Sequence, residues 1–167
     1  MGELAPDDNY FMERALSEAQ KAEEAGDVPV GAVVVRDGII IARAHNQREL
    51  LSDPTAHAEI LALTQAASVV GTWRLIDCDL FVTKEPCPMC AGALINARIR
   101  RVVLGARDIK GGACGSVLNI TNHPQLNHQV TVEDGILSDV CASILTSFFA
   151  NKRRGARADE WDGLENR

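Results

Sequence analysis

The sequence predicts an α/β fold whose sheet contains both antiparallel and parallel strands. Two β-branched runs within residues 30–42 are joined through Asp37-Gly38, a strong signal for a hairpin of antiparallel strands. Residues 80–104 contain a strand pattern, a helix pattern and a second strand pattern, and such a β-α-β unit joins parallel strands by a right-handed crossover. The chain has 167 residues and no internal repeat or long linker, so we expect one domain over residues 1–167.

A helix is expected before the hairpin, from about Tyr10 to Gly26. Asp7 or Asp8 supplies its N-cap, and the glycine stops it. Its apolar residues recur at helical spacing: Phe11, Ala15, Leu16, Ala19 and Ala22. The hairpin strands then occupy residues 30–35 and 39–42.

A second helix is expected to begin at Asp53-Pro54 and to continue toward Gly71. Aspartate is a good N-cap, and proline suits the first helical turn. The β-α-β unit follows, with a strand at residues 80–83, a helix at 88–97 and a strand at 102–104.

The last third of the chain predicts a long loop, a strand and a helix. Residues 105–127 are rich in glycine and polar residues, and long loops of this kind are often functional. We expect a short strand around residues 129–132 and a helix over about 138–154. Residues 155–167 are polar and are expected to form a frayed tail.

Composition indicates a soluble protein of the cytoplasm. Hydrophobic residues make up 46% of the chain, yet no apolar run approaches the roughly 20 residues of a membrane helix. Residues 1–8 lack the basic and apolar regions of a signal peptide. Five cysteines are an odd number, and their scatter favours a reducing compartment over a disulfide framework.

The net charge of −6 argues against indiscriminate nucleic-acid binding, which needs an excess of positive charge. Two basic clusters stand out against it: Arg98, Arg100, Arg101, Arg107 and Lys110, and then Lys152, Arg153, Arg154 and Arg157. From charge alone, these clusters are either local phosphate-binding patches or ordinary solvated helix ends.

One histidine, one glutamate and two cysteines stand at the spacing of a zinc site. His57 and Glu59 lie near one expected helix start, and Cys87 and Cys90 lie at another, where the helix dipole favours thiolate. A structural zinc is closed by four protein ligands, whereas a catalytic zinc keeps one position for water, and a His/Cys/Cys set leaves that position open. Glu59 is then free to move protons.

Other interpretations of these residues remain open at this point. His57 alone is compatible with a structural role, and Cys87 and Cys90 also form a possible redox pair. The two cysteines are also compatible with half of a structural zinc site closed by Cys114 or Cys78. Because the two motifs occur together, we favour catalytic Zn²⁺, with the remaining cysteines as small buried side chains.

Three stretches resemble the zinc-dependent nucleoside and nucleobase deaminases of the cytidine and deoxycytidylate deaminase superfamily: residues 27–33, 53–60 and 85–93. A fourth stretch, residues 105–108 followed by Lys110, Gly111, Gly115 and Ser116, resembles the tRNA adenosine deaminase (TadA) family. The resemblance covers nearly the whole chain. It implies a three-layer α/β/α, cytidine-deaminase-like fold with a mixed five-stranded sheet.

The resemblance also implies an activity and its partners. A zinc-dependent hydrolase of this kind deaminates the wobble adenosine of a tRNA anticodon loop to inosine, using zinc-activated hydroxide and a glutamate proton shuttle. The expected partners are a tRNA anticodon stem-loop and a second copy of the chain in a homodimer, with no membrane. Unpaired loop bases reduce the free energy needed to extract one base from its stack.

Individual roles follow by the same likeness. His57, Cys87 and Cys90 are expected to bind one zinc ion, and Glu59 to shuttle protons. The expected substrate-binding residues are Val30, Asn46, Ala58, Pro86, Asp108, Lys110, Phe149 and Arg153. Lys84 departs from the pattern, because the family usually has an apolar residue before Glu85-Pro86-Cys87.

Two other functions compete with this hypothesis. The zinc motifs alone suit a small-molecule deaminase acting on guanine, cytosine or a free nucleotide equally well, whereas the later loop and the basic clusters favour RNA. The second alternative is a noncatalytic RNA-binding module whose zinc only stabilises the fold, and Glu59 distinguishes it from an enzyme.

Overall fold

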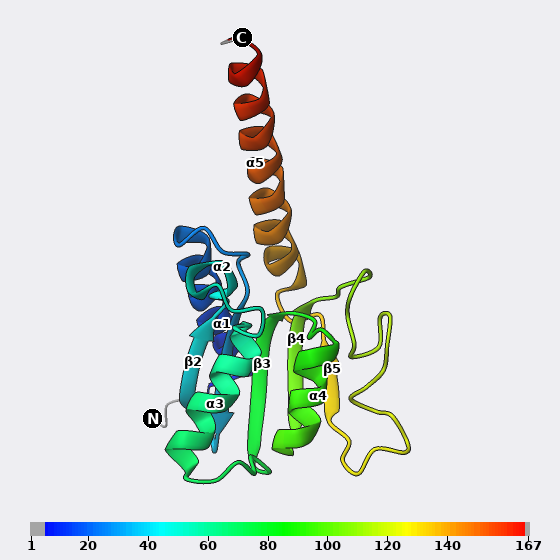
Figure 1. The fold of residues 1–167 in the computed structure, drawn as a ribbon. Coiled ribbons are helices and arrows are strands. Elements are labelled where there is room, and N and C mark those ends of the chain that lie inside the picture. Colours follow the sequence, from blue (N-terminus) through cyan, green and yellow to red (C-terminus); the bar gives the residue numbers. More distant parts are fainter. Residues whose placement is uncertain (1–5, 166–167) are drawn as a thin grey trace.

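The computed structural model describes residues 6–165, with side chains up to residue 156. The strands are β1 (Gly31–Arg36), β2 (Ile39–His45), β3 (Cys78–Lys84), β4 (Arg101–Ala106) and β5 (Thr131–Asp134). The helices are α1 (Asp8–Glu24), α2 (Arg48–Leu51), α3 (Ala58–Val70), α4 (Pro88–Ala97) and α5 (Ser138–Glu165). Figure 1 shows their arrangement around a single sheet.

The sheet has five strands in the order β2-β1-β3-β4-β5. Strand β1 pairs antiparallel with β2 and β3, while β3, β4 and β5 are parallel to one another. The hairpin and the β-α-β unit predicted from the sequence are therefore confirmed, and so is the mixed five-stranded sheet.

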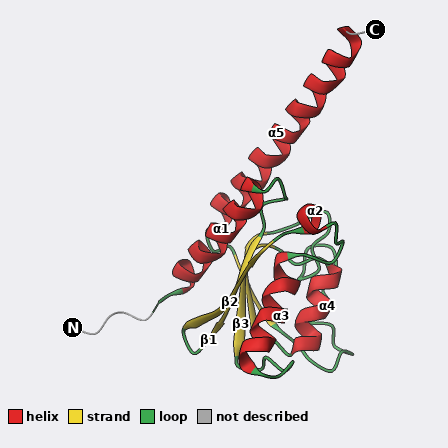
Figure 2. Ribbon diagram, turned by 60° about the vertical axis from the view of Figure 1, so that its left-hand side comes forward, coloured by secondary structure: helices red, strands yellow, loops and turns green. Residues whose placement is uncertain are grey.

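Hydrophobic side chains fill both faces of the sheet, which gives three layers. Ala32 and Val34 of β1 face α3 and α4, whereas Val33 and Val35 face α1 and the start of α5. Figure 2 shows the two helix pairs on opposite sides of the strands. Because α3 and α4 share one face, the ends of these two helices lie near each other.

The second helix begins later than predicted. The Asp53 carboxylate accepts hydrogen bonds from the N–H and the hydroxyl of Thr55, at 2.7 and 2.8 Å, and so closes a turn rather than capping a helix. Helix α3 begins at Ala58, with His57 as its N-cap residue. Asp53-Pro54 therefore marks a turn that ends directly before His57, not the start of the helix.

Two further elements differ from expectation. The short helix α2 was not predicted, because its stabilising contacts come from a distant residue. The buried Asp27 accepts the N–H groups of Glu49 and Leu50 at 2.8 and 3.1 Å. Strand β5 begins two residues later than predicted, in a register that pairs Thr131 with Arg101 of β4.

Helix α5 continues beyond its predicted end at residue 154. It runs to Glu165 and projects away from the sheet (Figure 1), so this helix is longer than the sequence predicted. The helix can continue through Gly155 because a glycine in a helix interior costs only about 1 kcal/mol, and residues 156–165 contain no proline that would end it. Residues 166–167 lie outside the described part, and neither α5 nor any other described helix combines the length and apolarity of a membrane span.

Candidate metal centre and substrate pocket

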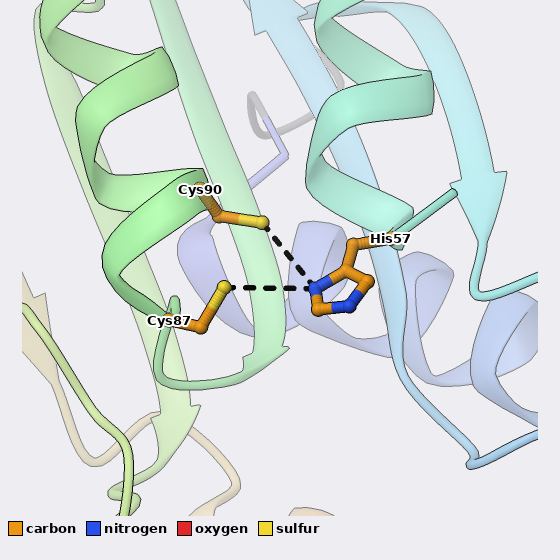
Figure 3. Close-up of side chains that lie close together, drawn as sticks. All are labelled: His57, Cys87 and Cys90. Carbon is orange, nitrogen blue, oxygen red and sulfur yellow. Dashed lines mark hydrogen bonds between the residues drawn. The ribbon is translucent and has the colours of Figure 1, made fainter. Parts of the chain in front are cut away.

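The predicted metal ligands come together at the N-terminal ends of α3 and α4. His57 and Cys87 are the N-cap residues of the two helices, and both have extended backbones. Pro88 occupies the first turn of α4, where its missing N–H costs nothing, and Cys90 follows within that turn. Figure 3 shows the imidazole and both thiols directed toward one point.

The distances between these side chains fit a zinc site. The Nδ1 atom of His57 lies 3.6 Å from the Sγ atom of Cys87 and 3.6 Å from that of Cys90. Zn–N and Zn–S bonds of about 2.0 and 2.3 Å at tetrahedral angles place nitrogen and sulfur about 3.6 Å apart. Three corners of a tetrahedron are thus formed by the protein, with donor types that zinc prefers.

The two thiols have very different proton affinities. Hydrogen bonds from Cys90 and His57 lower the pKa of Cys87 to about 4, although partial burial opposes this shift. The pKa of Cys90 is raised by its hydrogen bond to Cys87 and by burial. One proton is therefore retained by the pair in the metal-free site, and a divalent ion would displace it.

Glu59 is enclosed beside this cluster. It lies in the first turn of α3 and is only 4% exposed. Burial raises the pKa of its carboxyl, and a hydrogen bond with Cys90 is among the opposing effects. Glu59 is not one of the clustered donor atoms, so it is available for proton transfer.

A pocket of about 230 Å³ opens onto the ligand cluster. Its lining residues are Val28, Val30, Asn46, Arg48, His57, Ala58, Glu59, Lys84, Glu85, Cys87 and Phe149. This volume lies below the range usual for drug-sized ligands and suits a single nucleobase. The pocket combines an apolar wall with amide, carboxylate and cationic groups.

Cys78, Cys114 and Cys141 do not take part in the cluster. Each is buried and unpaired, and burial is the main cause of the raised pKa of its thiol. Among the described side chains, no histidine, cysteine or carboxylate supplies a fourth donor atom to the group of His57, Cys87 and Cys90. This arrangement disfavours a closed structural zinc site.

Comparisons with known proteins now add to this geometry. A family model described as MafB19-like deaminase matches residues 6–153. A tRNA-specific adenosine deaminase of Bacillus subtilis (strain 168) is 48% identical over 151 residues, which are 90% of this chain and 94% of that protein. The chain belongs to the tRNA-specific adenosine deaminase family.

Solved structures agree with this family and show how widely its fold is used. A structure from studies of A-to-I editing by tRNA:A34 deaminases matches with a TM-score of 0.79 and 47% identity, over 81% of this chain and 99% of that one. A guanine deaminase from Nitrosomonas europaea matches with a TM-score of 0.76 but 27% identity, over 89% and 87%. The fold is shared by both, and the sequence is more similar to the tRNA deaminases.

Four of the family-derived substrate positions lie in the pocket wall: Val30, Asn46, Ala58 and Phe149. Asn46 is 7% exposed and is fixed in place, because its Nδ2 donates to the Val28 carbonyl at 3.2 Å and its Oδ1 accepts the Arg48 N–H at 3.3 Å. Polar contacts on both sides of the amide hold the side chain at the wall.

The other four family-derived positions do not line the pocket. The carbonyl of Pro86 accepts the Ala113 N–H at 2.8 Å, so this group faces the long loop. Lys110 and Arg153 are exposed, the first on that loop and the second on α5. Asp108 does not line the pocket but contacts two residues that do, Lys84 through its carboxylate and Glu85 through its N–H.

Sequence reasoning missed the pocket roles of Val28, Arg48 and Glu85, and it noted Lys84 only as a departure. Glu85 is buried and accepts the N–H groups of Asp108, Cys114 and Ser116 at 2.9, 3.0 and 3.1 Å. The available signal in the sequence was a glutamate that closely follows the apolar strand pattern at residues 80–83 and directly precedes Pro86-Cys87. A carboxylate buried at such a position needs several hydrogen-bond partners.

Proposed function

We propose that this protein deaminates the wobble adenosine of a tRNA anticodon loop to inosine. The observation that carries the proposal is a buried glutamate beside three zinc-type ligand atoms at one end of a base-sized pocket. The 48% identity to a tRNA-specific adenosine deaminase supports the choice of substrate. We include in the proposal a single deaminase domain that acts in the cytoplasm, in keeping with its free cysteines.

Zinc fits the site formed by His57, Cys87 and Cys90, and when bound it supplies a nucleophile by lowering the pKa of water to about 7. Glu59 would accept one proton of the attacking water as its oxygen adds to C6 of adenine, and would pass that proton to the ring nitrogen N1. It would then take the proton of the new C6 hydroxyl and deliver it to the leaving amino group. The new C6–O bond replaces the C6–N6 bond, and ammonia and inosine leave.

The pocket wall orients the base for this attack. Val30 and Ala58 give apolar contact to the flipped nucleoside, while the fixed amide of Asn46 offers hydrogen bonds at its edge. Pro86 holds the chain that carries Cys87, through its bond to Ala113. Water is excluded when a base fills the cavity, which strengthens the electrostatic effects inside.

The RNA surface extends from the pocket mouth to α5. Phe149 is 42% exposed at the mouth and offers a ring for base stacking. In this proposal Asp108 and Lys110 on the loop meet flanking nucleotides, and Arg153 on α5 helps to hold the backbone of the anticodon loop. The side chain of Arg157, part of the same basic cluster in the sequence, lies outside the described residues.

We also propose a homodimer. A shallow groove between α3 and α4, lined mostly by apolar side chains, includes Ile60, Ala67 and the half-exposed Trp73. A second copy would cover this face. Light scattering with size-exclusion chromatography should give twice the chain mass, and Trp73→Glu should give a monomer that still binds zinc.

The central test replaces Glu59 with glutamine, which keeps the shape of the side chain and removes its basicity. We expect the variant to bind one zinc ion per chain and to fold normally, but to lose at least about 10²-fold in inosine formation from an anticodon stem-loop. Unchanged turnover would remove Glu59 from the mechanism. Turnover of free guanine by the wild type, without turnover of the stem-loop, would instead establish a small-molecule deaminase.

A further inference from the structure

Lys84 lies at the end of β3, where the strand enters the pocket. Its side chain is 32% exposed, and its Nζ atom lies 2.6 Å from the Oδ2 atom of Asp108. Parallel pairing brings this about, because Lys84 lies opposite Ala106 of β4, two residues before Asp108. The ion pair thus joins the rim of the pocket to the loop that follows β4.

Asp108 organises that loop. Its Oδ1 atom accepts the N–H groups of Lys110 and Gly111 at 3.0 and 3.1 Å, and its own N–H donates to the buried Glu85. Consecutive residues of the chain therefore hold Asp108 from two sides, Lys84 at the carboxylate and Glu85 at the backbone.

A carboxylate at the pocket mouth disfavours the approach of RNA phosphates, and a cation beside it offsets this effect. Arg107, the adjacent cation, is directed elsewhere, since its Nε atom donates to Asp134 at 2.6 Å and its NH1 atom lies 3.6 Å from Glu85. Among the described side chains, Lys84 is the cation within ion-pair distance of Asp108. An uncompensated carboxylate here would repel the phosphates of a nucleic acid.

We propose that Lys84 is a positioning residue for the RNA substrate: it holds the Asp108 carboxylate at the pocket mouth and cancels its charge toward the phosphate backbone. This inference rests on the proposed function. Lys84 acts through Asp108, so it affects substrate binding much more than the chemical step.

The test compares Lys84→Met, Asp108→Asn and the double variant on an anticodon stem-loop. A unit charge about 7 Å from a phosphate, at an effective dielectric between about 20 and 80, changes binding by about tenfold. We therefore expect Lys84→Met to raise KM about tenfold with kcat within twofold of the wild type. Adding Asp108→Asn to Lys84→Met removes the uncompensated carboxylate and should bring KM back to within about twofold of the wild type, because the intact pair as a whole is also neutral.

Two further variants separate this role from a general structural one. Lys84→Arg should keep KM near the wild-type value. Lys21→Met should leave KM unchanged, because it breaks a lysine–carboxylate pair of 2.7 Å with Glu18 that lies outside the pocket lining. Thermal unfolding of each variant shows whether folding is intact.

The proposal is overturned if Lys84→Met leaves KM within about twofold of the wild type, or if the double variant keeps the raised KM of Lys84→Met. Fluorescence anisotropy with a labelled stem-loop gives the same comparison as dissociation constants, without any turnover. The absence of inosine from the zinc-loaded wild type would refute the proposed function, whereas the variant ratios decide the role of Lys84.

Discussion

The buried carboxylate of Glu85 leads to a quantitative prediction. Replacing it with glutamine preserves its shape but places an NH₂ group among hydrogen-bond donors. The least costly orientation puts that group near Ser116 Oγ, which can turn to accept, and leaves the Asp108 N–H facing another donor. The bonds to Cys114 and Ser116 then lose the charge of their acceptor.

The expected cost follows from these contacts. Losing one hydrogen bond to a charged group costs about 1.5–3 kcal/mol, and weakening the others adds to it, so we expect the free energy of unfolding to fall by about 3 kcal/mol at pH 7. Urea unfolding of zinc-saturated protein measures this change. Glu24→Gln, the same substitution at an exposed position near the end of α1, is the matched control and should shift stability by less than about 0.5 kcal/mol.

The pH dependence of the difference checks its origin. Burial raises the pKa of Glu85, but the hydrogen bonds from Ser116, Asp108 and Cys114 outweigh this effect. The pKa of the folded state therefore lies below the ordinary value of 4.5. A lowered folded pKa stabilises fully above pH 4.5, and this stabilisation is lost as pH falls through the folded value. The gap between wild type and variant should therefore close on acidification. A gap below about 1 kcal/mol at pH 7, or one that widens below pH 4.5, would refute the reasoning.

Four further outcomes are expected. Gly112→Ala places a Cβ atom against the Glu85 carboxyl and should lower stability by about 1–3 kcal/mol in urea; wild-type stability would show that the loop yields freely. In Gly31→Ala, the added Cβ atom would meet the backbone of α1 and push β1 away from that helix. Calorimetry should show a Tm lower by about 5 °C or more, and an unchanged Tm would contradict this packing. Removal of zinc by a chelator should abolish inosine formation and lower Tm, both restored by about one equivalent of Zn²⁺, and full activity without metal would exclude the proposed site. In metal-free protein at pH 6, Cys87 should react with iodoacetamide much faster than the buried Cys141, because the pKa of Cys87 is about 4 and that of Cys141 is about 11. Mass spectrometry of the alkylated protein measures both rates. Equal rates would contradict the geometry of the site.

Local sequence signals predicted the sheet well. The Asp37-Gly38 turn and the alternation of strands with α4 depend on neighbouring residues, so the hairpin and the parallel pair were predictable. The N-terminus of α3 was placed too early because Asp53 serves equally well in a turn, and only the contact with Thr55 decides between the two. The end of α5 was placed too early because Gly155 is a weak stop inside a helix.

The metal ligands were predictable for a similar reason. Zinc chemistry restricts the residue types and their spacing, and the structure brings the side chains of His57, Cys87 and Cys90 together. The rim of the pocket was less accessible to sequence reasoning. Lys84 and Asp108 are 24 positions apart in the numbering, and their contact depends on the register of two parallel strands. That register depends on how the crossover through α4 packs both strands against the core, so the residues next to Lys84 and Asp108 do not reveal it.

The pairing of β3 with β4 also constrains which changes in chain length the protein can tolerate. Inserting or deleting one residue in Arg101–Ala106 would turn alternate side chains to the opposite face and carry Asp108 out of reach of Lys84. Residues 122–127, on the loop that leads to β5, are exposed, and their hydrogen bonds are local, so they are free of this restriction. Natural variation and engineered insertions should therefore accumulate in that second stretch, while the distance from β4 to Asp108 stays constant.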